Sequence, residues 1–227
     1  GALGMGYGVL TNTFLLQFGL TPAVASANVH LAELFNTGVS GLSHWKLGNV
    51  DWSLFKKLII PGMLGGIIGA YILTEIPGNT IKPFVSVYLL VLGLYILWKA
   101  FKQLELRSVT TKIKRLAFVG GFFDAVGGGG WGPIVTSTLL ARGSHPRFTV
   151  GSVNTTEFFV TGAQSLAFVL TIGFVGWNLI GGLIIGGVIA APLGAFVCKK
   201  VSAKSLMLLV GSLIVVLNSW SLLRLFL

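Results

Sequence analysis

The stretch FFDAVGGGGWGP, residues 122–133, interrupts an apolar run that is long enough to cross a membrane. Glycine costs about 1 kcal/mol and proline about 3 kcal/mol in the interior of a helix. Successive glycines let the backbone leave helical geometry, and proline is favoured in the first turn of a new helix. The stretch therefore predicts a helix that breaks at residues 127–130 and restarts near Pro133 as a half-helix.

The composition is that of an integral membrane protein. Of the 227 residues, 54% are hydrophobic and 10% are charged, whereas soluble domains have about 25% charged residues. Many of the lysines and arginines behind the net charge of +10 lie near the ends of apolar segments. Such residues set membrane orientation and contact anionic lipid, so membrane lipid is an expected partner and nucleic acid is not. The single cysteine, Cys198, excludes a disulfide framework, and no cofactor is expected.

The apolar segments predict an all-α polytopic membrane protein with about eight transmembrane segments. Their approximate bounds are 1–18, 23–44, 54–74, 81–101, 116–141, 147–172, 178–198 and 205–226. Simple alternation places most basic residues on the side of the polar loop 102–115, which favours a cytoplasmic loop. If segments 1–18 and 116–141 turn back instead of crossing, the basic residues are distributed differently between the two sides of the membrane, and this argument for the orientation no longer holds.

The two halves of the chain match when the sequence is shifted by 124 positions (157 − 33 = 124). The matches include Gly4, Gly6, Gly8, Pro22 and Glu33, which fall on Gly128, Gly130, Gly132, Pro146 and Glu157. This predicts two homologous four-segment repeats, residues 1–101 and 116–227, joined by the linker loop 102–115, with glycine-broken helices at the centre. Whether the repeats are parallel or inverted stays open. The counterparts of residues 115–127 fall mostly before residue 1, so we expect the natural chain to begin upstream.

Duplicated, interrupted helices are typical of secondary transporters, whose binding site lies where the breaks meet. The N–H groups at a half-helix start, with the helix dipole behind them, bind anions. The candidate substrate-binding residues are Gly6, Gly8, Asn12, Thr13, Gly128, Gly129, Gly130, Trp131, Gly132, Thr136, Ser137 and Asn154. Glycines can instead permit tight helix packing, and we expect this of Gly65, Gly66, Gly69, Gly181, Gly182, Gly186 and Gly187.

Several motifs together resemble the sulfite exporter TauE/SafE family of membrane permeases. They are the repeated glycine-rich breaks, the Gly-x-x-Pro turns at 19–22 and 143–146, and the Gly-x-Val-x-Trp stretches at 48–52 and 173–177. The resemblance covers nearly the whole chain. It implies transport of sulfite, a sulfonate or a related organic oxyanion across the plasma membrane. The first repeat departs from the usual triple-glycine run, because Met5 and Tyr7 separate its glycines.

Polar side chains recur every three or four residues in two apolar segments, which places them on one helix face. Ionisable groups inside a membrane are costly and usually line a cavity or a proton relay. The candidate proton-coupling residues are Glu33, Glu157, His30 and Asp124. Glu33 and Glu157 can instead be structural carboxylic acids, and Asp124 can cap a half-helix or bind a coupling cation. Arg142 and Arg147 form either a headgroup-facing cluster or a funnel for anions.

The sequence therefore predicts a secondary transporter that moves a small inorganic or organic anion by alternating access, with proton coupling as an option. The alternative is a divalent metal ion transporter, with His30 and Glu33 as ligands three residues apart on a helix. His30 matches Asn154 in the second repeat, which argues against a duplicated metal site. An intramembrane enzyme is not expected, because Gly-x-Ser-x-Gly, paired aspartates and a His/Cys cluster of metal-site spacing are absent. Assembly as a homo-oligomer is left open.

Overall fold

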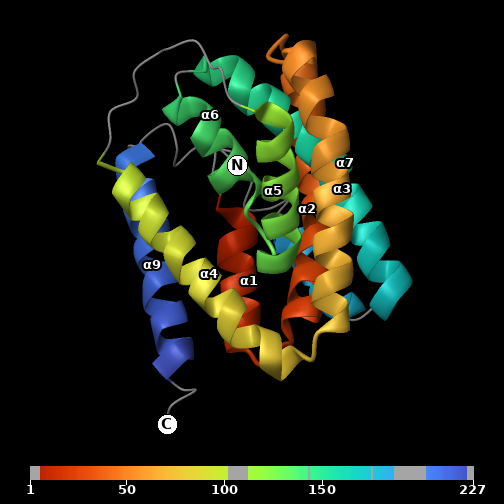
Figure 1. The fold of residues 1–227 in the computed structure, drawn as a ribbon, viewed down its shortest axis with the longest axis vertical. Coiled ribbons are helices and arrows are strands. Elements are labelled where there is room, and N and C mark those ends of the chain that lie inside the picture. Colours follow the sequence, from red (N-terminus) through yellow and green to blue (C-terminus); the bar gives the residue numbers. More distant parts are fainter. Residues whose placement is uncertain (1–5, 102–111, 143, 175, 187–202, 224–227) are drawn as a thin grey trace.

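The computed structural model describes residues 6–101, 112–142, 144–174, 176–186 and 203–223, and every regular element in these ranges is helical (Figure 1). The elements are α1 (Tyr7–Gln17), α2 (Pro22–Lys46), α3 (Trp52–Glu75), α4 (Gly78–Lys99), α5 (Ile113–Gly127), η1 (Gly132–Thr136), α6 (Ser137–Ala141), α7 (Pro146–Ile172), the helix Trp177–Gly186 and α9 (Ala203–Leu223). The all-α prediction is confirmed. Gly4, Gly187, Cys198 and most of the predicted linker 102–115 lie outside the described residues.

Local sequence signals set several helix starts. Pro22 and Pro146 occupy the first positions of α2 and α7, where the missing N–H group would have had no partner anyway. The carboxylate of Asp51 accepts hydrogen bonds from the N–H groups of Ser53 (2.8 Å) and Leu54 (3.2 Å), which caps α3. These residues fix where α2, α3 and α7 begin, so the connections that precede these helices are short.

Close contacts at glycines show how the long helices pack. α2 and α7 are antiparallel, because Gly38 faces Phe158 while Gly162 faces Leu34. α4 and α9 are also antiparallel (Figure 1). α3 runs parallel to α5, and Gly69 of α3 packs on the backbone of Phe122. The packing interpretation is confirmed for Gly65, Gly66 and Gly69, whereas no described atom lies within 4 Å of a Cβ placed on Gly181, Gly182 or Gly186.

Segment 116–141 turns back instead of crossing. After the break, η1 and α6 form an arm that lies against α5, since a Cβ on Gly120 would meet the side chain of Val135. Val135 and Leu139 of this arm share a buried cluster with Leu54 at the start of α3. Figure 1 shows α6 returning to the end of the molecule where α5 begins. The segment therefore enters and leaves at the same end.

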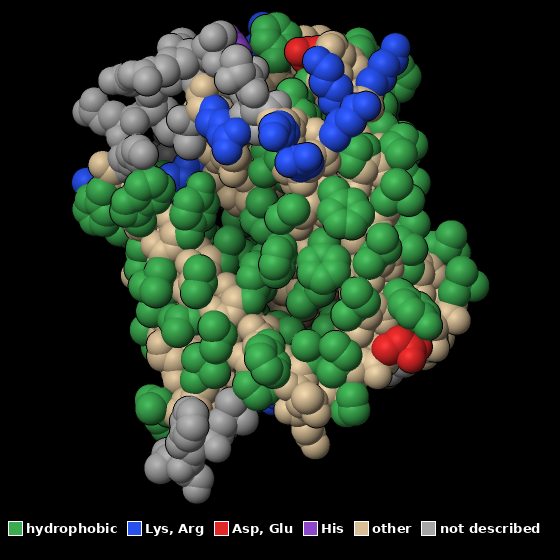
Figure 2. Space-filling view, in the orientation of Figure 1, with side chains coloured by type: hydrophobic (Ala, Val, Ile, Leu, Met, Phe, Trp, Pro, Cys, Tyr) green, Lys and Arg blue, Asp and Glu red, His purple; other side chains and the backbone are tan. Residues whose placement is uncertain are grey.

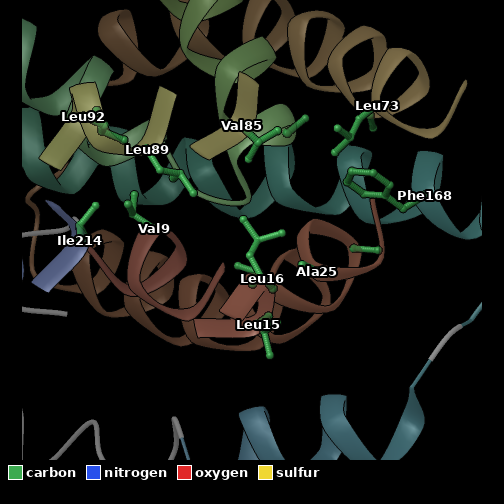
Figure 3. Packing of buried hydrophobic residues seen from close by; sticks show 14 of the residues in the cluster. Val9, Leu15, Leu16, Ala25, Leu73, Val85, Leu89, Leu92, Phe168 and Ile214 are labelled. Atoms are coloured by element: carbon green, nitrogen blue, oxygen red, sulfur yellow. The ribbon is translucent and has the colours of Figure 1, made fainter. Parts of the chain in front are cut away.

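The first segment, α1, begins near the α5 break and runs toward the opposite end of the molecule (Figure 1). Its buried residues Val9 and Leu16 pack in one cluster with Val85 and Leu89 of α4 and with Phe168 of α7 (Figure 3). This core fixes the start of α1 in the interior, where it meets the break.

The molecular surface has an apolar middle and a basic end. Two helices among the described residues, α3 and α4, are long and apolar enough to cross a membrane. Figure 2 shows hydrophobic side chains over the middle of one face and Lys and Arg side chains gathered near the starts of α3 and α5. Lys56, Lys57, Lys114 and Arg115 are exposed in these helix starts. An apolar band with a basic end is the pattern expected of a membrane-embedded protein.

Candidate functional site

The break itself depends on two glycines with backbone angles that other residues rarely adopt. Gly128 has φ 61° and ψ 34°, and Gly129 has φ 141°. The N–H group of Gly129 donates to the carbonyl oxygen of Asp124 (3.0 Å), which closes the end of α5. Side chains are strained at such φ values, so the sequence GGGG is needed for this turn and not only for helix packing.

The carboxylate of Asp124 caps the restart of the helix. Its Oδ1 accepts hydrogen bonds from the N–H groups of Gly130 (2.6 Å) and Trp131 (2.8 Å). Its Oδ2 accepts one from Nε2 of Gln164 (2.9 Å) and lies 3.3 Å from Nε2 of His30. Asp124 is buried, so these contacts replace its hydration. The geometry supports the capping interpretation. The carboxylate of Asp124 occupies the N–H groups of Gly130 and Trp131.

The imidazole of His30 lies between two acceptors. Its Nδ1 is 2.7 Å from the carbonyl oxygen of Ser26, and its Nε2 faces Asp124. A ring with a proton on each nitrogen would donate to both acceptors, and His30 and Asp124 would then form a buried ion pair. The helix-face pairing of His30 with Glu33 is therefore not the closest contact of this ring. Among the described residues, no group of three or more His, Cys, Asp or Glu side chains could hold a metal ion.

The start of α1 touches the break directly. A Cβ placed on Gly8 would lie 2.8 Å from Cα of Gly129 and 2.6 Å from Oε1 of Glu33. Nδ2 of Asn12 donates to the carbonyl oxygen of Gly127 (2.6 Å), which ties α1 to the end of α5. We call this contact between residues 6–12 and 127–131 the glycine junction. It brings together the glycine-rich stretches of both halves of the chain.

The α1 start is a helix N terminus without a side-chain cap among the described residues, and its N-cap residue Gly6 has φ 103°. The first N–H groups of any helix have no partner inside that helix. Glu33 is 7% exposed and lies beside this start, and no described residue donates a hydrogen bond to its carboxyl group. Glu157 of α7 is partly buried and close enough to Glu33 for the two negative charges to repel. The structure thus gathers Glu33 and Glu157 near the junction.

Other predicted residues line the helices around the junction. Oγ1 of Thr13 accepts a hydrogen bond from Nδ2 of Asn218 (3.2 Å). Asn154 donates to Oγ of Ser40 (3.2 Å), across the contact between α2 and α7. Trp131 is fully buried and its Nε1 donates to the carbonyl oxygen of Val153 (3.1 Å), so it walls the break.

The remaining predicted residues lie along the arm that follows the break. Gly132 begins η1 and is buried, and Oγ1 of Thr136 is buried without a described hydrogen-bond partner. Oγ of Ser137 accepts a hydrogen bond from Nζ of Lys99 (2.7 Å). Arg142 is exposed just after α6, away from the junction.

Arg147 is exposed at the start of α7, away from the junction. It donates to Oδ1 of Asn49 (2.6 Å) and to the carbonyl oxygen of Leu47 (3.1 Å), and so fastens α7 to the connection between α2 and α3. These hydrogen bonds give Arg147 a structural role, in addition to the role predicted for it in a funnel for anions.

Sequence reasoning did not single out Tyr88 of α4, although it reaches the break. Its hydroxyl group lies where a Cβ on Gly130 would be placed, and its ring edge lies where one on Gly127 would be. The hydroxyl is buried and has no described hydrogen-bond partner. A tyrosine in an apolar segment gives no local signal of this contact.

Because of the Tyr88 contact, the effect of Gly130→Ala on transport can be reversed by a second substitution at Tyr88. We expect Gly130→Ala to lower transport about tenfold, because the added methyl group overlaps the Tyr88 hydroxyl. Tyr88→Phe removes that oxygen, so the double variant should recover most of the loss. Flux assays on proteoliposomes with equal amounts of inserted protein measure the effect. Equal losses in the single and the double variant would contradict the contact.

Comparison with known proteins identifies the family. The sequence profile of the family described as "Sulfite exporter TauE/SafE" matches residues 1–220. The "Probable membrane transporter protein YtnM" of Bacillus subtilis (strain 168) is 43% identical over 234 residues, which cover 99% of this chain and 78% of that protein. The "Probable membrane transporter protein ORF9" of Sinorhizobium sp is 28% identical over 131 residues, 56% of this chain and 50% of that protein. No solved structure matches.

These matches confirm the resemblance that the glycine breaks and turn motifs indicated. They also confirm that the chain is a transporter of a small solute and not an enzyme. The chain belongs to the sulfite exporter TauE/SafE family of membrane transporters.

Proposed function

We propose that this protein is a secondary transporter that moves a small oxyanion, such as sulfite or a sulfonate, across the plasma membrane by alternating access. The observation that carries the proposal is the glycine junction, where the start of α1, which has no side-chain cap among the described residues, meets the break after α5 in the interior. N–H groups at a helix start bind anions without any basic side chain. Broken helices at such a depth are tolerated where they line a cavity or contact protein.

The proposal includes two inverted repeats, residues 1–101 and 116–227. Contacts between α2 and α7 support it, because Leu34 faces Gly162 and Gly38 faces Phe158. Both pairs are related by the shift of 124 (158 − 34 and 162 − 38), so each contact is the exchanged image of the other. α2 and α7 run in opposite directions, as do α4 and α9 (Figure 1). Such exchange is the signature of a two-fold axis, around which the two repeats rock during alternating access.

The anion occupies the α1 side of the junction in this proposal. Asp124 already holds the N–H groups of Gly130 and Trp131, whereas the first N–H groups of α1 have no side-chain cap among the described residues. Gly6, Gly8 and the break glycines carry no side chain, so other groups can approach their backbone closely. Asn12 and the other polar residues nearby complete the binding site.

Charge balance around the junction favours proton coupling. His30 offsets Asp124, which leaves Glu33 and Glu157 as further acidic groups near one small site. An anion next to Gly8 would be repelled by an ionised Glu33, since the carboxyl oxygen lies beside that glycine. Anion binding therefore takes up a proton on Glu33, and the anion and the proton move together.

Glu33→Gln tests this coupling. In the wild type, binding with uptake of one proton lets the half-saturating anion concentration rise by up to about tenfold per pH unit as pH increases. Glutamine mimics the protonated form, so the variant should show a flat pH profile. Glu75→Gln, at the exposed end of α3, is the matched control and should keep the wild-type slope. An unchanged slope in Glu33→Gln would rule out Glu33 as the coupling group.

Counterflow tests alternating access directly. Proteoliposomes loaded with unlabelled anion should accelerate entry of the labelled anion, because a carrier returns faster when loaded. A channel shows no such acceleration. Anion flux without acceleration would therefore reject the carrier mechanism while keeping the anion as the substrate.

A further inference from the structure

One face of α4 carries a polar stripe that follows the arm formed by η1 and α6. Tyr88, Tyr95 and Lys99 are seven and four residues apart, which places them within about 40° of one another around a helix. The Tyr88 hydroxyl lies beside Gly130. The Tyr95 hydroxyl lies near Thr138, and Nζ of Lys99 donates to Oγ of Ser137 (2.7 Å). The stripe therefore contacts the arm from the break to its last turn.

Lys99 is the charged member of this stripe. It is 7% exposed, and among the described residues the one ion pair joins His30 to Asp124, so no described carboxylate neutralises Lys99. An ammonium group has three N–H donors, and one of them binds Ser137. Burying such a charge is unfavourable unless it is paired. A buried cation with spare donors and no described counter-ion is suited to bind an anion.

Two buried polar atoms, one in α4 and one in the arm, have no described hydrogen-bond partner. They are the hydroxyl of Tyr88 next to the break and Oγ1 of Thr136, one residue before Ser137. Ser137 lies five residues after Gly132, about 8 Å along a helix. Lys99 ends α4 at the end of the molecule where Lys and Arg side chains gather (Figures 1 and 2). The polar stripe thus joins the glycine junction to the basic end.

We propose that Lys99 and Ser137 form a second binding station for the transported anion, between the glycine junction and the basic end of the molecule. The proposal rests on the proposed anion transport. The ammonium group of Lys99, positioned by Ser137, attracts the anion from the basic end, and the hydroxyl of Thr136 donates to it. The anion then passes along the arm to the start of α1. In this account Lys99 supplies selectivity for negative charge that the junction, with its acidic side chains, does not supply alone.

The test compares Lys99→Met with Lys99→Arg in proteoliposomes. The probe is whichever of sulfite, sulfate, ethanesulfonate and acetate gives the highest flux through the wild type. We expect Lys99→Met to raise the half-saturating concentration at least about tenfold, the effect of losing one charge-assisted contact. Lys99→Arg keeps the positive charge and should stay within about threefold of the wild type. Lys57→Met removes an exposed lysine from the same end of the molecule and should leave the value unchanged.

A purely structural role for Lys99 predicts a different result. It would lower the thermal midpoint and the maximal flux of Lys99→Met and leave the half-saturating concentration as it is, and this result would overturn the proposal. If Lys99→Met inserts poorly, Ser137→Ala keeps the lysine and removes one hydroxyl, and a three- to tenfold rise is expected; no rise would overturn the proposal. Flux of none of the four anions through the wild type would overturn the proposed function and the second station together. Wild-type flux with normal saturation in Lys99→Met would overturn the station alone.

Discussion

Gly129→Ala is expected to abolish transport, with a fall in flux of about 100-fold or more. The added Cβ would fall on the backbone of Gly8 and Val9, at the point where α1 meets the break. Backbone atoms cannot rotate out of the way as a side chain can, and overpacking costs about 1–3 kcal/mol. The φ of 141° adds strain of about 1–3 kcal/mol for any residue with a Cβ. The junction must open to relieve both, and the substrate site opens with it.

Gly162→Ala is the matched control for this variant. Gly162 also lies in a helix of the interior, but a Cβ there would meet Leu34 at 3.5 Å, which is an ordinary contact. We expect its flux to stay within about twofold of the wild type, since the methyl group fits without overpacking. Flux measurements should be normalised to inserted protein. Normal flux through Gly129→Ala would remove the glycine junction from the mechanism.

Asp124→Ala is expected to destabilise the fold more than any other single loss of a polar group described above. It leaves the N–H groups of Gly130 and Trp131 without a partner in the interior, at about 1–3 kcal/mol each. It also leaves the buried His30 without its counter-charge. Removing one partner of a buried ion pair costs about 3–5 kcal/mol. The apparent thermal midpoint in detergent should fall by about 10 °C or more.

Asp51→Ala provides the comparison, because Asp51 also caps a helix with two backbone hydrogen bonds. Asp51 is exposed, so water replaces the lost bonds and the cost is about 1 kcal/mol. Its midpoint should fall by about 3 °C. Similar shifts in the two variants would mean that the buried network around Asp124 contributes no more than an ordinary cap.

Much of the fold is encoded locally and could be read from the sequence. Pro133 and the preceding glycines predicted the break, and the structure has it with Gly128 and Gly129 at positive φ. Pro146 predicted the start of α7 in the same way. The sequence does not decide whether segment 116–141 reverses, because a crossing segment and a hairpin of two half-helices bury equally apolar side chains. Contact of Gly120 with Val135 decides between them, and no periodicity encodes that contact.

The site was predicted only in part for a related reason. Local spacing placed His30 and Glu33 on one helix face, but the partner of His30 is Asp124, 94 residues later. Tyr88 and Lys99 were not singled out, because their partners Gly130 and Ser137 lie on an arm whose direction depends on the reversal. Pairings between distant segments follow from tertiary packing, which a single sequence does not display.

Anion flux through purified protein in proteoliposomes is the decisive test of whether this protein transports an oxyanion. Sulfite, sulfate, ethanesulfonate and acetate should be offered in turn, with a divalent metal ion as the alternative substrate and Gly129→Ala as the inactive reference. We expect saturable flux of at least one of these anions, faster at acidic pH, and loss of this flux in Gly129→Ala. If none of the four anions is transported and the metal ion shows saturable flux, the proposed anion transport is wrong.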